Sequence, residues 1–498
     1  MQRTCCRTFV LFLWFLALFA LEAHVVGQES KPASDADSSQ DASVRTEQPP
    51  RPNIVLMMAD DLGWGDTGYN GHRQIQTPHL DEMSRQGLKM NRFYAASPVC
   101  SPTRGSCLTG RHASRYGIRT ANDGTLKEQE ICLAQILADC GYLTGHFGKW
   151  HLGTLTTTTV DSNRGRPGNM ADFAPPWRRG FRTCFSMEAL APTWWESGDY
   201  ENGKSRYWTG LNQPADPELV HGDDSRVVVN QASELIQVAA GKAQPFFVVI
   251  WFHAPHQPVV GGIDYRRRYP EATEDQQHYF AAVTAMDEQI GQLRQTVKSA
   301  GVEQNTMVWF CSDNGPEGNP GPQNRSQGTA GQFRGRKRSL YEGGIRVPGI
   351  VVWPDQIPNP RETSVAGVTS DYFPTILEAL KLTPTDQRPY DGVSLMPLIR
   401  GEAWRRPCPI HFHFELQSAT SDQRFKLIHN RAPQRLQSDD GATPYSAWEL
   451  YDLIDDPGET RDLAEMQPDV VHSMRLALAE WETSCQQSSA GRDYPQRP

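Results

Sequence analysis

The fold prediction starts from one stretch of the sequence, Ile54-Val55-Leu56-Met57-Met58-Ala59-Asp60-Asp61. Its apolar run is short and continuous, which is typical of a strand that is buried on both faces of a sheet. Two carboxylates follow at once, where the strand leaves the sheet. The stretch therefore predicts a central strand with acidic side chains at its carboxyl end.

The same arrangement returns further along the chain. An apolar run at residues 246–252 leads into His253-Ala254-Pro255-His256, and another at 307–311 leads into Ser312-Asp313-Asn314-Gly315. A weaker run at 142–147 leads into Gly148-Lys149-Trp150-His151. Ligands of parallel sheets bind beyond the carboxyl ends of the strands. The polar residues of all four segments gather at that edge of the predicted sheet.

Helical patterns separate these strands, at residues 126–139, 223–240 and 276–300. Strands that alternate with helices predict an α/β fold, with a large, mostly parallel sheet sandwiched by helices and right-handed crossovers. A further strand at 350–353 and a helix at 371–380 complete a catalytic domain over residues 51–404.

From residue 405 the pattern changes to short strand-like segments, at 410–414, 425–429 and 448–453, before a final helix at 470–485. This pattern predicts a smaller C-terminal α+β subdomain over 405–498, with a small antiparallel sheet and a terminal helix. Earlier in the chain, residues 154–219 lose periodicity and are rich in Gly, Pro, Trp and Arg. Such a stretch is either a wall of the substrate pocket or a surface insertion.

The N-terminal residues have the pattern of a targeting segment. Residues 1–27 carry two arginines, an apolar run and then small residues, which predicts a secretory signal peptide. An uncleaved membrane anchor is the alternative, although the run is short for a full span. Residues 28–50 are polar and predict a disordered lead-in. We expect a secreted or periplasmic protein with no stable membrane span after signal cleavage.

Composition excludes some functions. The formal net charge of −9 is the opposite of the basic excess that nucleic-acid binding requires. If the substrate is anionic, positive potential must therefore be local. The chain has ten cysteines, and an odd number remains after the signal and Cys100 are set aside, so the sequence supports no disulfide assignment.

One motif lies outside the strand pattern, Cys100-Ser101-Pro102-Thr103-Arg104, followed by Leu108-Thr109-Gly110-Arg111. Pro102 suits the first turn of a helix, which places Cys100 at a helix N-terminus among unpaired backbone donors, a site for an anion. The alternative from the residues alone is a proline-containing loop that enters an ordinary helix with a buried thiol.

The pattern C-x-P-x-R-x-x-x-L-T-G-R resembles the signature of the type I sulfatases, a family of the alkaline-phosphatase-like superfamily whose cysteine is oxidised to formylglycine. The resemblance implies that Cys100 is the precursor of the nucleophile and that a formylglycine-generating enzyme matures the protein. Residues 328–348 and the chain length look most like the group of N-acetylgalactosamine-6-sulfatase and arylsulfatase A. The C-terminal segment 448–459 also resembles the family's ending.

Oxygen ligands for a metal lie at two strand ends. Asp60, Asp61, Asp313 and Asn314 are hard donors that suit Ca²⁺ or Mg²⁺ and not zinc. Paired acids at strand ends can also cap helices. The resemblance implies Ca²⁺, with the modified Cys100 as a further ligand.

The resemblance also implies roles for basic residues. Arg104, Lys149 and Lys337 match the family residues that hold the sulfate and the formylglycine. His151 and His256 match the histidines that transfer protons, a role that suits their near-neutral titration. Each could instead be a hydrogen-bonded structural histidine. His253 is a second candidate for the proton donor, but His256 begins the H-x-P pattern that fits the family better.

The resemblance implies an exported sulfatase that hydrolyses sulfate esters of carbohydrates or aryl sulfates. A phosphatase or phosphonate hydrolase of the same superfamily is an alternative, although its second metal site requires more acids and histidines than the sequence offers. A non-catalytic sulfoglycan-binding protein with the same fold is another alternative, but such a protein is expected to have lost Cys100 or the metal acids.

Overall fold

The computed structural model describes residues 51–198, 200, 203, 205–318, 320–321, 323–384, 386–436 and 445–494. The predicted signal peptide and lead-in lie outside these residues. Within the described ranges, no helix is both long enough and apolar enough to cross a membrane. The chain from Pro50 to Pro498 forms one compact unit.

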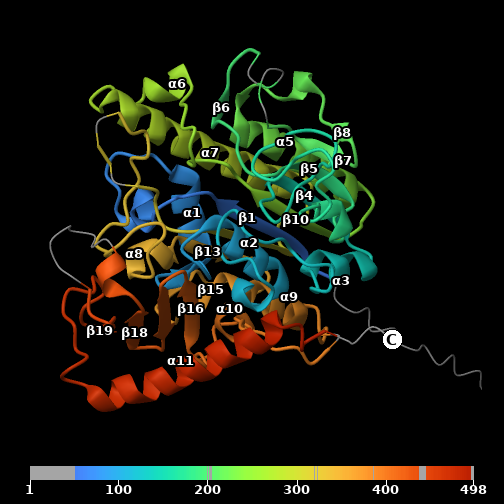
Figure 1. Ribbon diagram of the computed structural model, residues 1–498. Helices are drawn as coiled ribbons and strands as arrows, with labels where there is room; N and C mark the ends of the chain where they lie inside the picture. Colours follow the sequence, from blue (N-terminus) through green and yellow to red (C-terminus); the bar gives the residue numbers. More distant parts are fainter. Residues whose placement is uncertain are drawn as a thin grey trace, which may run out of the picture. The chain divides into compact units, whose positions relative to one another are not determined.

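A ten-stranded sheet forms the centre of this unit (Figure 1). Its middle is parallel throughout and consists, in spatial order, of β11 (Thr306–Ser312), β1 (Asn53–Ala59), β10 (Phe246–Trp251), β4 (Leu143–Lys149) and β5 (Thr183–Met187). The predicted large, mostly parallel sheet is confirmed. Parallel pairing brings the carboxyl ends of β1, β4, β10 and β11 to one edge, as the sequence pattern requires.

The outer strands are mixed in direction. β13 (Gly349–Val352) runs antiparallel to β11, then β2 (Leu88–Met90) antiparallel to β13, and β14 (Arg361–Thr363) parallel to β2. At the other edge, β7 (Trp208–Gly210) and β8 (Gln213–Pro214) are antiparallel. Residues 154–219 therefore contribute β5, β7 and β8 to the sheet, which the faded periodicity did not predict.

Helices cover both faces of the sheet. Alternate residues of β1 separate two cores, with Ile54, Leu56 and Met58 on one face and Val55, Met57 and Ala59 on the other. The first core contacts α2 (Cys100–Thr109), α3 (Leu133–Asp139), α9 (Tyr372–Ala379) and α10 (Met396–Ile399). The second contacts α1 (Pro78–Gln86), α5 (Asp224–Gly241) and α7 (Glu274–Ser299). This double coverage is why β1 reads as a continuous apolar run.

One predicted helix is wrong at its start. The pattern at 126–139 predicts a continuous helix, but α3 begins only at Leu133. Leu126 donates its backbone N–H to the Leu152 carbonyl at 2.9 Å, and Glu130 is held by Arg111 at 3.2 Å. These tertiary contacts keep residues 126–132 out of the helix.

The C-terminal part forms a four-stranded antiparallel sheet, of β16 (Ile410–Phe414), β17 (Gln417–Ser421), β18 (Phe425–Asn430) and β19 (Trp448–Asp452). The long helix α11 (Pro468–Ser489) follows, drawn in red in Figure 1. The predicted antiparallel sheet and terminal helix are confirmed, while a boundary at residue 405 stays a prediction. β17 was not predicted, because its small polar residues are buried by pairing on both sides.

The remaining elements are short. They are β3 (Phe93–Tyr94), β6 (Trp194–Trp195), β9 (Gly222–Asp223), β12 (Arg346–Val347), β15 (Gly367–Val368), α6 (Ile263–Arg266) and α8 (Glu342–Ile345).

Candidate active site

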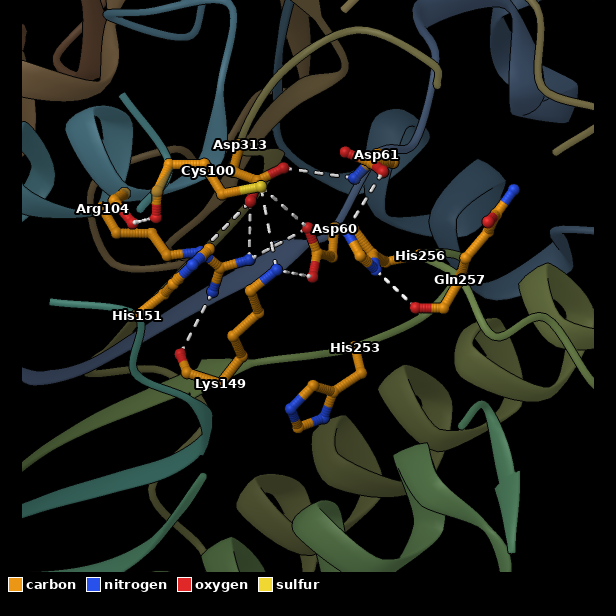
Figure 2. Close-up of polar contacts among 12 residues, drawn as sticks. Asp60, Asp61, Cys100, Arg104, Lys149, His151, His253, His256, Gln257 and Asp313 are labelled. Atoms are coloured by element: carbon orange, nitrogen blue, oxygen red, sulfur yellow. Dashed lines mark hydrogen bonds and ion pairs between the residues drawn. The ribbon is translucent and has the colours of Figure 1, made fainter. Parts of the chain in front are cut away.

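The predicted site residues meet at the carboxyl edge of the parallel strands. Asp60 and Asp61 follow β1, Asp313 and Asn314 follow β11, and Lys149 ends β4. Figure 2 shows Asp60, Lys149 and Asp313 close to Cys100, the first residue of α2. The backbone at Asp61 and His151 is left-handed, with φ of 64° and 55°, a conformation that costs most residues about 1–3 kcal/mol and clusters at functional sites.

The Cys100 thiol is buried, with 1% of the residue exposed. Its Sγ lies 3.5 Å from Asp60 Oδ1 and 3.7 Å from Lys149 Nζ. Burial, followed by the charge of Asp313, raises the pKa of the thiol well above its usual range. An unmodified Cys100 is therefore a neutral thiol and a weak nucleophile.

Three buried ion pairs surround the thiol. Arg104 Nη2 lies 2.6 Å from Asp313 Oδ2, and Lys149 Nζ lies 2.6 Å from Asp60 Oδ2. Lys337 Nζ lies 2.6 Å from Asp61 Oδ1. Three carboxylates are thus each paired with a cation in a buried part of the site, where charges interact with less screening than in water.

The pKa values of Asp61 and Asp313 are shifted in opposite directions in this arrangement. Burial raises the pKa of Asp61, but the charges of Lys337, His256 and Lys149 together outweigh burial and hold the pKa well below its usual range. Burial, then repulsion from Asp60, raises the pKa of Asp313 to about 6. The same two groups lie close together, since the Asp61 backbone N–H donates to Asp313 Oδ1 at 3.1 Å.

The two candidate histidines after β10 have different surroundings. His256 Nε2 lies 3.7 Å from Asp61 Oδ2, and 18% of its side chain is exposed. Burial, then the charge of Lys149, lowers its pKa to about 3. His253 is buried, and its Nδ1 lies 2.9 Å from Asp224 Oδ2. In Figure 2 the His253 ring lies outside the dashed contacts that join the other labelled groups.

His151 belongs to the site through its neighbours. Its Nε2 lies 3.3 Å from Asn122 Oδ1 and 3.2 Å from Asn163 Nδ2. Its Nδ1 is buried and has no hydrogen-bond partner among the described residues. Burial, then the charge of Lys149, lowers the pKa of His151 well below its usual range.

The donor set can hold a cation. Ligand atoms of Asp60, Asp61, Cys100 and His256 all lie within 4.8 Å of one another, and no other such cluster occurs among the described residues. Asn314 Nδ2 donates to Asp61 Oδ1 at 2.7 Å, while its Oδ1 is buried without a hydrogen-bond partner. A buried carbonyl oxygen that lacks a donor is an unsatisfied acceptor, and a hard cation satisfies it. His256 was not expected in this cluster.

Three further residues of the site escaped the sequence analysis. Glu317 Oε2 lies 3.2 Å from Lys337 Nζ, and Asn122 and Asn163 bracket His151. None of them belongs to a motif, and only chain folding brings them near. Glu317 follows Asn314 by three residues, which is the one signal that could have suggested it.

Two family models match the chain. The model described as Sulfatase covers residues 52–382, and the model described as N-sulphoglucosamine sulphohydrolase, C-terminal, covers residues 328–483. N-acetylgalactosamine-6-sulfatase of Mus musculus is 31% identical over 383 residues, which are 72% of this chain and 68% of that protein. Arylsulfatase A of Homo sapiens is 29% identical over 470 residues, 85% of this chain and 86% of that protein.

Solved structures share the fold. The crystal structure of Ps i-CgsB in complex with k-i-k-neocarrahexaose has a TM-score of 0.73 at 23% identity and covers 88% of this chain and 94% of that chain. The phosphonate monoester hydrolase of Agrobacterium radiobacter has a TM-score of 0.60 at 20% identity, over 88% of this chain and 96% of that chain.

The site gathers a cysteine, carboxylates and cations at the carboxyl edge of a mostly parallel α/β sheet, which is where ligands of such sheets bind. With the match over residues 52–382, it follows that the chain belongs to the sulfatase family. The protein is accordingly a sulfuric ester hydrolase.

Proposed function

We propose that this chain is an exported sulfatase that hydrolyses sulfate esters of carbohydrates, with formylglycine formed from Cys100 as nucleophile and Ca²⁺ as cofactor. The observation that carries the proposal is the position of the Cys100 thiol, 3.5 Å from a carboxylate oxygen of Asp60 and 3.7 Å from Lys149 Nζ. A neutral buried thiol gains little from such surroundings. An aldehyde at the same position would be hydrated, and its hydroxyls would be polarised by these groups.

The residues present fit Ca²⁺. Asp60, Asp61, Asp313 and Asn314 would hold it through oxygen atoms, together with residue 100, and the unsatisfied Oδ1 of Asn314 is available for this purpose. Bound there, Ca²⁺ would act as a Lewis acid towards a sulfate oxygen and add two positive charges. Since the ionic side chains of the site already balance one another, the added charge would attract an anionic ester.

The cations of the chain suit a sulfate. Arg104, Lys149 and Lys337 are each held by a carboxylate, so their positions are set before substrate arrives. Cleavage shifts negative charge onto the bridging oxygen, and fixed cations lower the free energy of that state without reorganising. Loss of one such group typically costs about 10²–10³-fold in turnover.

In this proposal, His256 and His151 transfer the protons. His256 is part-exposed, so its ring can donate a proton to a leaving alcohol, and a bound anionic ester beside it favours the protonated ring. His151 is held by Asn122 and Asn163, and its unpartnered Nδ1 can accept a proton from residue 100. Proton transfer of this kind typically contributes about 10²–10⁴-fold.

The proposed substrate class is supported by the comparisons with known proteins, and the proposed export by the N-terminal sequence. Relatives named N-acetylgalactosamine-6-sulfatase and a structural neighbour solved with neocarrahexaose support a sulfated carbohydrate over a simple aryl sulfate. The signal-like segment at residues 1–27 supports export to the periplasm or beyond. Maturation would need a formylglycine-generating enzyme as a partner.

The test is to express the chain with and without a formylglycine-generating enzyme. We expect the peptide that contains Cys100 to lose roughly 18 Da on conversion, and hydrolysis of 4-nitrophenyl sulfate to rise in proportion to the converted fraction. Cys100→Ala should lower that activity by several orders of magnitude. Cys107→Ala, in the same helix, is the matched control and should retain activity. Full activity with unconverted Cys100 would disprove the mechanism.

Two further measurements complete the test. A screen of sulfated mono- and oligosaccharides identifies the ester, and metal analysis of the active protein should find calcium and not zinc. Faster hydrolysis of 4-nitrophenyl phosphate or a phosphonate ester than of any sulfate ester would favour the alternative function in the same superfamily.

A further inference from the structure

The protein has a cavity of about 420 Å³ whose lining residues include none of the ion-paired residues of the active site. Its walls come from the segment after α2, from the C-terminal sheet and from α11. Its volume falls within the range of about 300–1,000 Å³ that is usual for small-ligand sites. The residues that matter for its chemistry are Ser114, Arg119, His413, Arg431, Trp481 and Glu482.

The cavity carries positive charge in a protein whose formal net charge is −9. Arg119 is exposed and makes no hydrogen bond or ion pair within the described residues. Arg431 is held by Glu482 and by Ser418 Oγ, the latter at 2.9 Å. Glu482 is thus the one carboxylate among the residues that line the cavity, which also include two arginines. A guanidinium fork suits a tetrahedral or carboxylate oxyanion.

Both guanidinium groups face the same histidine. Burial, followed by the charge of Arg431, lowers the pKa of His413, and Arg119 acts in the same direction. A neutral His413 adds no charge, and it can hydrogen-bond a hydroxyl group, with its Nδ1 already 3.1 Å from Ser418 Oγ. The cavity thus combines one unpaired cation with neutral polar groups.

An aromatic ring completes the wall. Trp481 is only 8% exposed, and its Nε1 donates to Asp391 Oδ1 at 2.8 Å. The indole also stacks on His411, with ring centroids 5.2 Å apart. A rigid aromatic surface beside charged and hydroxyl groups matches a sugar ring, which has an apolar face and a polar edge.

A short segment joins this cavity to the active site. Arg119 lies three residues before Asn122, whose Oδ1 is 3.3 Å from His151 Nε2. Between them, the Ala121 carbonyl accepts a hydrogen bond from Ser101 Oγ at 2.7 Å, next to Cys100. Three residues span at most about 10 Å. The backbone at Arg119 and that at the edge of the catalytic centre are therefore within the length of a short oligosaccharide.

We propose that this cavity is a subsite for a second anionic sugar unit, so that the enzyme acts on sulfated oligosaccharides in preference to single sugars. The inference rests on the proposed function, because it takes the group bound at Cys100 to be a sulfated sugar. Arg119 would bind a sulfate or carboxylate of the distant unit, and Trp481 would pack against its ring. Neither residue would touch the sulfate that is cleaved.

The experiment measures binding of chondroitin 6-sulfate hexasaccharide, and of the disaccharide, to the full-length chain by calorimetry. All proteins carry Cys100→Ala, so no sulfate is released during the titration. Arg119→Glu is compared with Arg85→Glu, which reverses the same charge at an exposed arginine of α1. Because Arg119 has no partner within the described residues, its replacement should leave the fold intact, which circular dichroism checks.

We expect Arg119→Glu to weaken hexasaccharide binding at least about tenfold, the equivalent of about 1.4 kcal/mol, without weakening disaccharide binding comparably. Arg85→Glu should change neither. Equal hexasaccharide affinities in the two variants would overturn the subsite, as would a parent protein that binds the hexasaccharide no better than the disaccharide. Hydrolysis of 4-nitrophenyl sulfate by matured protein tests the proposed function independently, because that substrate is too short to reach the cavity.

Discussion

His253 and His256 differ in what their side chains can reach. His253 is bound to Asp224 inside the protein, and Tyr207 donates to the same carboxylate at 2.6 Å. His256 is part-exposed beside Asp61. The two histidines belong to one motif of four residues, but only His256 is part-exposed, so we propose His256 as the proton donor and a structural role for His253.

The assignment predicts a dependence on the leaving group. His256→Ala should lower kcat for a sulfated sugar by about 10²–10⁴-fold, because an alcohol leaves poorly without a proton. The same change should lower kcat far less for 4-nitrophenyl sulfate, whose leaving group needs no proton. Steady-state kinetics on both substrates check this. An equal loss on both substrates, or a larger selective loss in His253→Ala, would contradict it.

Asp313 holds a buried cation in addition to its proposed role as a metal ligand. The guanidinium of Arg104 and the carboxylate of Asp313 are both fully buried, and Asp60 lies further from the same guanidinium, at 3.5 Å. Asp313→Ala should therefore abolish activity and also lower the free energy of unfolding by about 3–5 kcal/mol, because a buried charge is left without its partner. Urea denaturation measures the change.

The control for Asp313 is an exposed pair. Asp264 and Arg267 are both mostly exposed, 2.9 Å apart, and such pairs contribute about 0–1 kcal/mol. Asp264→Ala should accordingly leave stability nearly unchanged. A loss at Asp313 no larger than that at Asp264 would show that Arg104 finds compensation elsewhere.

Among the helices, α11 is held to the rest of the protein by several contacts, of which those around the Asp391 carboxylate are central. Asp391 accepts hydrogen bonds from Arg115 Nε at 2.7 Å and from Trp481 Nε1 at 2.8 Å. Arg115 in turn donates to Ser484 Oγ of α11 at 2.8 Å. Burial raises the pKa of Asp391, but the charge and hydrogen bond of Arg115, together with the backbone hydrogen bond from His112, outweigh burial and hold the pKa well below its usual range.

This contact predicts a pH dependence. A carboxyl whose pKa is lowered by folding stabilises the protein above its unfolded pKa of about 3.9, and the stabilisation is lost as the pH falls below that value. Asp391→Asn should therefore cost about 1.5–3 kcal/mol at pH 7 and progressively less below about pH 4. Urea denaturation at several pH values measures the difference, and Glu480→Gln on the exposed face of α11 is the control. A difference that stays constant down to pH 3 would refute the account.

At the scale of the whole molecule, the C-terminal sheet shares a core with the large domain. Tyr94, Leu340 and Ile345 pack in one cluster with Phe412 and Ile428 of the small sheet. The buried Lys426 Nζ lies 3.0 Å from Glu342 Oε1 and 2.9 Å from Glu459 Oε1, so charges also cross between the two parts. Separating the C-terminal sheet from the rest of the protein would expose the apolar side chains of this shared cluster and would leave Glu342 without the Lys426 charge.

The shared core predicts that residues 51–494 unfold in one step. Calorimetry should give a single transition whose calorimetric enthalpy equals the van't Hoff enthalpy. A chain that ends at residue 404 should fail to fold, because its half of the shared core and Glu342 would be left exposed. Two separate transitions, or a soluble and cooperative 1–404 fragment, would instead support independent domains.

The central parallel strands, and the polar residues that follow them at one edge of the sheet, could be predicted from the sequence alone. Strands such as β1 and β11 are buried on both faces, so their continuous apolar runs can be recognised without knowing which strands they pair with. Neighbouring parallel strands have their carboxyl ends at the same edge of the sheet. That is why Asp60, Asp61, Asp313 and Lys149 could be expected to meet. The proline in the first turn predicted a helix start near Cys100, which α2 confirms, but the role of Cys100 came from the resemblance to the sulfatases and not from the local residues.

Only the tertiary structure decided which of these groups pair and what surrounds them. The late start of α3, the antiparallel direction of β13, the separation of His253 from His256 and the contacts of Asn122 with His151 all depend on segments far apart in the chain. The cavity beside Arg119 is of the same kind. Local patterns report burial and backbone preference, whereas these features depend on which surfaces meet when the chain packs.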